Sequence, residues 1–186
     1  MSRRPMVLEL VFLSLLCLGG AGVLAQGGPP PPDATPGAPD ATPGAPGVSG
    51  GALGGINSAA APGYRLVMAE TVFTPGSYVT QHTHPTAIVV CVQSGALGFA
   101  IQAGMATVTR SETRATPDAA EQLALNAELV LEPGDCVAFD EFAEHTIHTA
   151  WNASSETTVI WEARLVKTDE PFTTFVDAQG TPVPAP

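Results

Sequence analysis

Positive charge is scarce in this chain of 186 residues, which has 7 Lys and Arg against 18 Asp and Glu. The formal net charge is −11 at pH 7. Nucleic-acid binders neutralise phosphates with Lys and Arg, so this balance excludes a typical nucleic-acid partner. It is compatible with a cationic or neutral ligand or with a metal, and equally with acidity that only keeps the protein soluble.

Residues 26–62 lack the apolar side chains that a core requires. They contain nine Pro and nine Gly, and Asp33 and Asp40 are their only charges. Such a segment cannot bury enough apolar surface to offset its ordering entropy, so we expect a disordered, semi-extended linker. Residues 63–186 remain, which suffice for one domain and are too few for two.

The first 25 residues have the parts of a secretory signal peptide. Arg3 and Arg4 precede an apolar run over residues 6–18, and small residues follow up to Ala25. We therefore predict a signal peptide over 1–25 and an exported bacterial protein of the periplasm, the cell envelope or the exterior. Two alternatives stay open, namely export by the twin-arginine route and an uncleaved segment that tethers the protein to the membrane.

The remaining domain is predicted to be all-β. Short runs rich in Val, Ile, Thr and Phe alternate with turn residues, and no long stretch has a helical period. This texture is typical of a β-sandwich or a small barrel. The expected strands are 65–73, 78–84, 87–93, 96–102, 105–110, 128–131, 135–139, 145–151, 157–165 and 172–176.

Only four histidines occur, and they lie in two short segments, His82-Thr-His84 and His145-Thr-Ile-His148. Side chains alternate along a strand, so His82 and His84 share one face and form a metal half-site. His145 and His148 are an odd number of residues apart and point to opposite faces. We choose His145 as the third ligand, because the bulk of Ile147 and Trp151 marks its face as the enclosed one. A bulge would reverse this parity.

The histidines belong to two longer patterns, Gly76-x5-His82-x-His84 up to Gly95, and Pro133-Gly134-Asp135-x9-His145. These patterns resemble the first and second motifs of the cupin superfamily, in its cupin 2 conserved barrel form. The resemblance extends over 63–175 and implies a single double-stranded β-helix, or jelly-roll barrel. It implies that His82, His84 and His145 bind one divalent transition metal, which could be Fe, Zn, Cu or Ni.

The sequence departs from that family at one ligand, because Ile88 stands where the first motif usually has a glutamate. Three imidazoles are still a workable ligand set with open positions. Glu162, Glu141 and Glu144 are candidate substitutes, although each could equally be a solvated charge. The alternative is a degenerate barrel that binds no metal.

The resemblance also places Cys91 and Cys136, the two cysteines that follow the signal peptide, on neighbouring antiparallel strands. A disulfide between them is then possible in an exported protein, and two separate buried thiols are the alternative. Strand parity puts Cys91 on the face opposite Ile88, away from the pocket.

The expected pocket is mostly apolar and is lined by Ile88, Val90, Ile147, Thr149 and Trp151. With no obvious general acid or base, it suits metal-centred oxidation of a small organic substrate, as in a three-histidine oxidase or dioxygenase. Whether the protein is an enzyme stays open. The alternatives are a non-enzymatic module that binds a small ligand or a metal, and an envelope protein whose barrel forms a homodimer.

Overall fold

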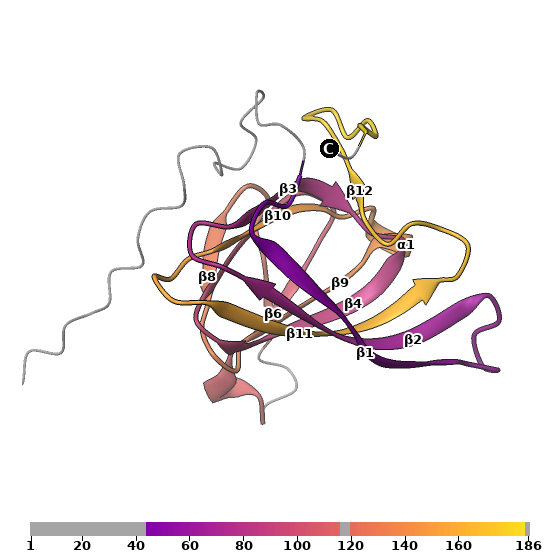
Figure 1. Ribbon diagram of the computed structural model, residues 1–186, viewed down its shortest axis with the longest axis horizontal. Coiled ribbons are helices and arrows are strands. Elements are labelled where there is room, and N and C mark those ends of the chain that lie inside the picture. The colour runs from indigo at the N-terminus through magenta and orange to yellow at the C-terminus, as the bar shows by residue number, and fades with distance from the viewer. Residues whose placement is uncertain (1–43, 116–119, 185–186) are drawn as a thin grey trace, which may run out of the picture.

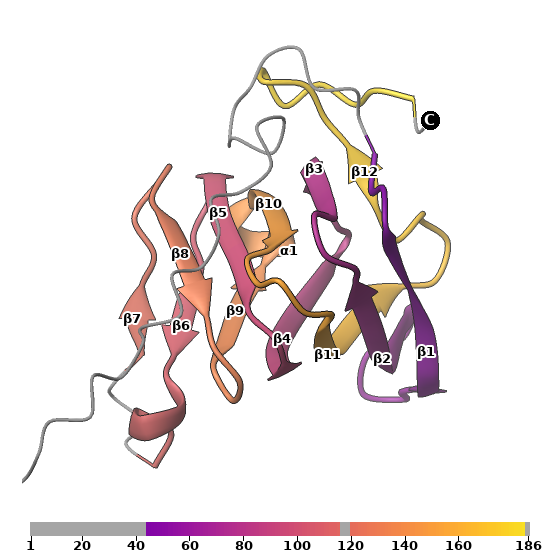
Figure 2. The same ribbon diagram turned by 60° about the vertical axis from the view of Figure 1, so that its left-hand side comes forward.

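The computed structural model describes residues 44–115 and 120–184, so the predicted signal peptide and most of the predicted linker lie outside it. The chain forms two antiparallel sheets that face each other (Figures 1 and 2). The seven-stranded sheet has the order β1 (Val48–Asn57), β2 (Tyr64–Phe73), β11 (Thr158–Lys167), β4 (Thr86–Ser94), β9 (Cys136–Asp140), β6 (Thr107–Thr109) and β7 (Glu121–Gln122). The five-stranded sheet has the order β12 (Thr174–Phe175), β3 (Tyr78–Thr83), β10 (Ile147–Asn152), β5 (Leu97–Ala103) and β8 (Glu128–Leu131).

The strand order confirms the predicted jelly-roll barrel. Four strands of one sheet, β2-β11-β4-β9, face four strands of the other, β3-β10-β5-β8. Along the chain, these eight strands alternate between the sheets, except that β8 follows β5 within one sheet. This is the winding of a double-stranded β-helix. Each of the ten expected strands corresponds to an observed one, with ends that differ by up to two residues. Two short helices, η2 (Ser111–Thr113, 3-10) and α1 (Glu141–Glu144), complete the described elements.

The core lies between the sheets, and strand alternation fills it. Ile88, Val90 and Val92 of β4 point inward and are buried, whereas Val89 points outward and is 42% exposed. The other members of the cluster come mainly from β5, β8, β9 and β11, and they include Leu97, Phe99, Ile101, Leu131, Val137, Phe139 and Ile160. These apolar side chains pack between the sheets, and several of them, among them Ile88, Val90 and Phe99, also line the cavity described below.

The predicted linker ends earlier than residue 62, because Val48–Asn57 forms β1 at the edge of the larger sheet. β1 pairs with β2 from Val48 opposite Phe73 to Asn57 opposite Arg65, and nearly all its side chains are exposed. The composition argument was correct that these residues bury little apolar surface. It missed that a strand can add to a sheet edge through main-chain hydrogen bonds alone. No helix among residues 44–115 and 120–184 has the length and hydropathy needed to cross a bilayer.

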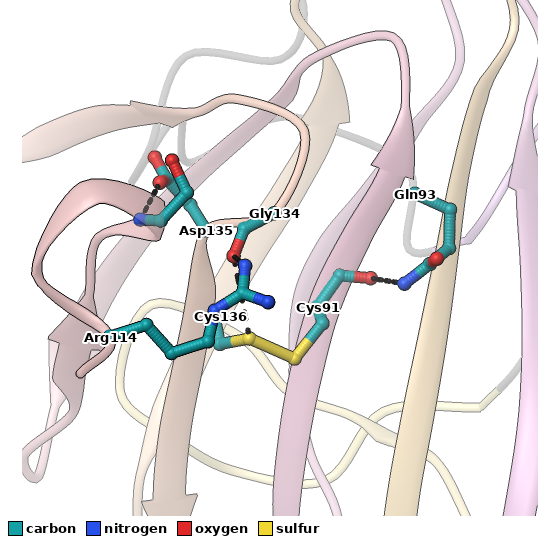
Figure 3. The surroundings of a disulfide bond; sticks show 7 residues. Cys91, Gln93, Arg114, Gly134, Asp135 and Cys136 are labelled. Carbon is teal, nitrogen blue, oxygen red and sulfur yellow. Dashed lines mark hydrogen bonds between the residues drawn. A yellow bond between two sulfur atoms is a disulfide. The ribbon is translucent and has the colours of Figure 1, made fainter.

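A disulfide joins Cys91 of β4 to Cys136 of β9 (Figure 3). The two residues lie directly opposite each other in the register of the two strands, on the outer face of the sheet. The turn before Cys136 is fixed as well, because Asp135 Oδ1 accepts a 2.8 Å hydrogen bond from the backbone N–H of Ser111, and Arg114 donates one of 2.6 Å to the carbonyl of Gly134. The bridge therefore cross-links two neighbouring strands of the seven-stranded sheet beside a turn that is itself held by hydrogen bonds.

Replacement of both cysteines, Cys91→Ser with Cys136→Ser, should lower the free energy of unfolding. The bridge closes a loop with a sequence separation of 45, for which the chain-entropy model gives roughly 4 kcal/mol. Urea unfolding of the oxidised protein and the double variant measures the difference. Because the bridge lies on the outer face, metal content should be equal in both proteins. Equal midpoints and slopes would contradict a stabilising role.

Candidate metal centre

Three imidazoles converge inside the barrel at the end of β3 and the start of β10. His82 is on β3, His84 follows the strand directly, and His148 is the second residue of β10. His148 lies opposite His82 in the strand register, so both side chains enter the barrel side by side. All three are at most 7% exposed, and their nitrogen ligand atoms lie within 4.8 Å of one another. This separation is small enough for the three nitrogens to share one ion.

The orientation of two of the rings suits metal binding. His82 Nδ1 lies 2.7 Å from the carbonyl oxygen of Thr80, and His84 Nδ1 lies 2.8 Å from that of Phe172. A carbonyl can only accept, so each Nδ1 carries the proton and each Nε2 keeps a free lone pair. Metal-binding histidines typically have such a partner on the second nitrogen. The donor set therefore fits a divalent transition metal.

Burial keeps the three imidazoles neutral. Loss of solvation lowers the pKa of His82 to about 4 and holds the pKa of His84 and of His148 well below the ordinary value of 6.5. Repulsion by His82 lowers the pKa of His84 and of His148 further, and Arg164 adds to this effect for His84. The unprotonated imidazole is the form that binds metal, so the site needs little deprotonation at neutral pH.

A buried carboxyl group contacts both histidine segments, at His84 and at His148. Glu141 is 4% exposed and belongs to α1, whose first turn is capped by the Asp140 carboxylate. Its Oε2 accepts hydrogen bonds from the backbone N–H of His84 and the hydroxyl of Thr83. Its Oε1 lies 3.6 Å from His148 Nδ1, and neither of these two atoms has a hydrogen-bond partner. Glu141 is thus placed to orient His148 from the Nδ1 side.

Burial raises the pKa of Glu141 to about 8, although the hydrogen bonds from Thr83 and His84 oppose this shift. In the absence of a metal, the carboxyl group and His148 are therefore both neutral at pH 7. Their 3.6 Å contact is not an ion pair under these conditions.

The choice of His145 as third ligand was wrong. His145 is exposed and ends α1 in a left-handed conformation, with φ 50° and ψ 47°. Its backbone N–H donates to the carbonyl of Glu141, and the strand β10 begins only at Ile147. The prediction took the bulk of Ile147 and Trp151 as the mark of the inner face. In the structure these two side chains lie on the outer face of β10, and the alternation within Ile147–Asn152 directs His148 inward.

The same error misplaced three residues of the expected pocket. Ile88 and Val90 line the cavity, whereas Ile147, Thr149 and Trp151 lie on the outer face of β10. Trp151 is 3% exposed there, because it packs against Tyr78 and covers Gly98, where a Cβ atom would lie 1.9 Å from the indole. A bulky apolar residue on a barrel strand thus need not mark the inner face.

The imidazoles face a cavity of about 400 Å³, within the size range of small-molecule sites. Its walls are largely apolar and include Ile88, Val90, Phe99, Phe139 and Ile160. Its polar side chains besides the histidines include Thr71, Glu162, Arg164 and Thr173, and residues 48–51 of β1 line it as well. The arrangement can hold a small organic molecule next to the histidine cluster.

None of the three acidic residues considered as a substitute ligand belongs to the histidine cluster. Glu141 is behind His148, as described above. Glu162 is buried on β11, where Thr71 and Arg164 donate to its two carboxylate oxygens. Glu144 lies on α1, beside a separate groove on the outside of the barrel. The structure thus places two of these carboxylates in buried positions, although a solvated charge was the simpler expectation for each.

Sequence reasoning missed Arg164 and Phe172 as site residues. The alternation of Ile160, Glu162 and Arg164 on a predicted strand was a signal for the first of them. Phe172 stacks on His84 at a centroid distance of 4.3 Å, and its own carbonyl holds His84 Nδ1. It comes from the segment between β11 and β12, so no strand pattern could have placed it there.

No protein-family model matches this chain, and no curated protein matches it. Solved structures with a similar fold include KdgF from Halomonas sp., at 18% identity over 67% of this chain and 84% of that one, with a TM-score of 0.44. A cupin 2 domain-containing protein from Halorhodospira halophila has 19% identity over 72% and 73% of the two chains, with a TM-score of 0.43. A cupin 2 conserved barrel domain protein from Salinispora arenicola has 14% identity over 63% and 74%, with a TM-score of 0.41. The strand order, and not these distant likenesses, carries the assignment of the jelly-roll barrel.

Two opposite pKa shifts predict a stability maximum near pH 6.5 for the metal-free protein. The histidines have a lower pKa folded than unfolded, so stability falls as the pH drops below 6.5 and the unfolded chain takes up protons first. Glu141 has a higher pKa folded, so its contribution is lost as the pH rises from 4.5 through 8. Thermal unfolding in chelator between pH 4.5 and 9 tests this. Glu141→Gln should remove the decline above pH 6.5, and a wild-type Tm that keeps rising to pH 8 would refute the assignment.

Proposed function

We propose that this protein is an exported metal-binding barrel that acts on a small organic molecule, in the manner of a three-histidine metal oxidase or dioxygenase. The observation that carries this proposal is the cluster of His82, His84 and His148, buried and mutually within 4.8 Å, at the wall of a largely apolar cavity. The ion would be Fe, Zn, Cu or Ni, all of which imidazole binds well.

The protein's own groups have distinct tasks in this proposal. The Nε2 atoms of His82 and His84 would hold the metal, because their Nδ1 atoms are engaged by backbone carbonyls. Glu141 would orient His148 and would balance part of the metal's charge. The apolar walls exclude water and position the substrate against the histidines. A bound transition metal would supply Lewis acidity and, in the case of Fe or Cu, redox chemistry.

A non-enzymatic module that binds a small ligand or a metal is the second candidate. One observation favours it, namely that Glu162 is fully engaged by Thr71 and Arg164. Among the described residues of the cavity, no carboxylate is therefore free to act as a general base. Export, which the sequence predicts, is part of either proposal, and a homodimer stays an alternative.

Metal content distinguishes the corrected ligand set from the predicted one. Protein purified without a His tag should contain one transition metal per chain, measured by elemental analysis after dialysis. His148→Ala should lose at least 90% of it, because a two-imidazole site is left with an affinity reduced roughly 100-fold. His145→Ala is the matched control, since its imidazole is exposed outside the barrel, and it should keep the full amount. Loss of metal in His145→Ala, with retention in His148→Ala, would refute the ligand set.

Oxygen uptake separates the enzyme from the binding module. The metal-loaded protein is mixed with thiols, diketones and phenols in an oxygen electrode, with His148→Ala as the inactive reference. Turnover in the wild type alone supports the oxidase proposal. A protein that holds its metal and consumes no oxygen with any of these substrates supports the binding module.

A further inference from the structure

An ion pair lies on the inner face of β11, among apolar neighbours. Ile160, Glu162 and Arg164 alternate inward and line the cavity. Glu162 accepts a 2.6 Å hydrogen bond from the hydroxyl of Thr71 on one oxygen, and the other oxygen accepts from Arg164 Nε, also at 2.6 Å, and from Nη2. Buried ion pairs contribute little net stability compared with apolar residues of similar volume. The presence of this one in a barrel core therefore calls for a functional reason.

Arg164 is held rigidly and yet keeps one edge free. Its guanidinium lies 3.8 Å above the ring of Phe172, and Ile88 is its partner on β4 in the strand register. Glu162 occupies the Nε and Nη2 edge. Within the described part of the chain, Nη1 donates no hydrogen bond to a protein atom. Guanidinium groups bind carboxylates in plane along such an edge, with two parallel hydrogen bonds in the best case.

The balance of charges around the cavity is compatible with a bound anion. Glu162 neutralises Arg164, and no carboxylate belongs to the histidine cluster, so a divalent ion at the histidines would carry its charge without a carboxylate ligand from the cluster. Phe172 contacts both Arg164 and His84, so the guanidinium and the histidine cluster are separated by little more than one aromatic ring. A molecule with a short body can reach both.

We propose that the cavity takes a small organic carboxylate with an apolar or aromatic body, and that Arg164 binds its carboxylate through the free Nη1 edge. The apolar walls, among them Phe99, Phe139 and Ile160, accommodate the body, and the rest of the molecule faces the histidines. This inference names the substrate class of the proposed function and rests on that function for its relevance. Arg164 acts as a specificity-determining residue in it.

Calorimetric titration with phenylacetate and with its neutral isostere phenylacetamide tests the inference. The protein is used both metal-free and loaded with Zn²⁺. The wild type should bind the anion at least tenfold more tightly than the amide in both states, because a charge-assisted hydrogen bond to a carboxylate is stronger than one to an amide. The double variant Glu162→Gln with Arg164→Gln removes the pair without leaving an unpaired buried charge, and it should lose this preference.

Arg65→Gln is the matched control, because it removes one exposed arginine from β2 outside the cavity, and it should keep the preference. Thermal unfolding verifies that the double variant is folded. Equal binding of the two compounds, binding of neither, or a preference that survives in the folded double variant overturns the role of Arg164.

Metal content of the same samples separates the two proposals. A protein without metal that still prefers the anion refutes the proposed function alone, and a metal-loaded protein without the preference refutes this inference alone.

Discussion

The pairing of β3 with β10 is the constraint on which the site depends. It sets His82 opposite His148, and the end of β3 brings His84 to the same place. A shift of that register by one residue would turn His148 to the outer face of the sheet. The bulge between His148 and Ala150 and the helical turn before β10 both act on this register. The histidine cluster inside the barrel therefore depends on where β10 begins and on how it pairs with β3.

The start of β10 is held in place by Glu141, which also supports the histidine cluster. Asp140 caps α1, and Glu141, the next residue, turns its carboxyl group inward to the backbone of His84 and toward His148. The helical turn thus leads into β10 and supplies the polar partner of His84 and His148. The hydrogen bonds from Thr83 and from the backbone of His84 make a buried carboxyl group tolerable here. Its contact with His148 adds to the main-chain pairing of β3 with β10.

The sequence predicted the fold well because most of its strands are regular, with β-branched residues and breakers at their ends. Alternation placed Ile88 and Val90 inward and Cys91 outward correctly, since β4 is one uninterrupted strand. The same argument failed for His145, because the face of Ile147 and Trp151 was taken as the inner one. Trp151 added to the error, since its burial against Gly98 on the outer face depends on a tertiary contact that no periodicity encodes.

The glycine-rich segment before the barrel shows a related limit of composition arguments. Few apolar side chains exclude a core, but they do not exclude a strand whose stability comes from a neighbour's main chain. Position 50 requires a glycine, because a Cβ atom there would lie 2.2 Å from the carbonyl oxygen of Glu70. Since residues 48–51 also line the cavity, the end of the expected spacer is one wall of the site. The predicted boundary between linker and domain at residue 63 therefore cuts through the part of the chain that forms the cavity. A barrel that begins at residue 63 would lack that wall.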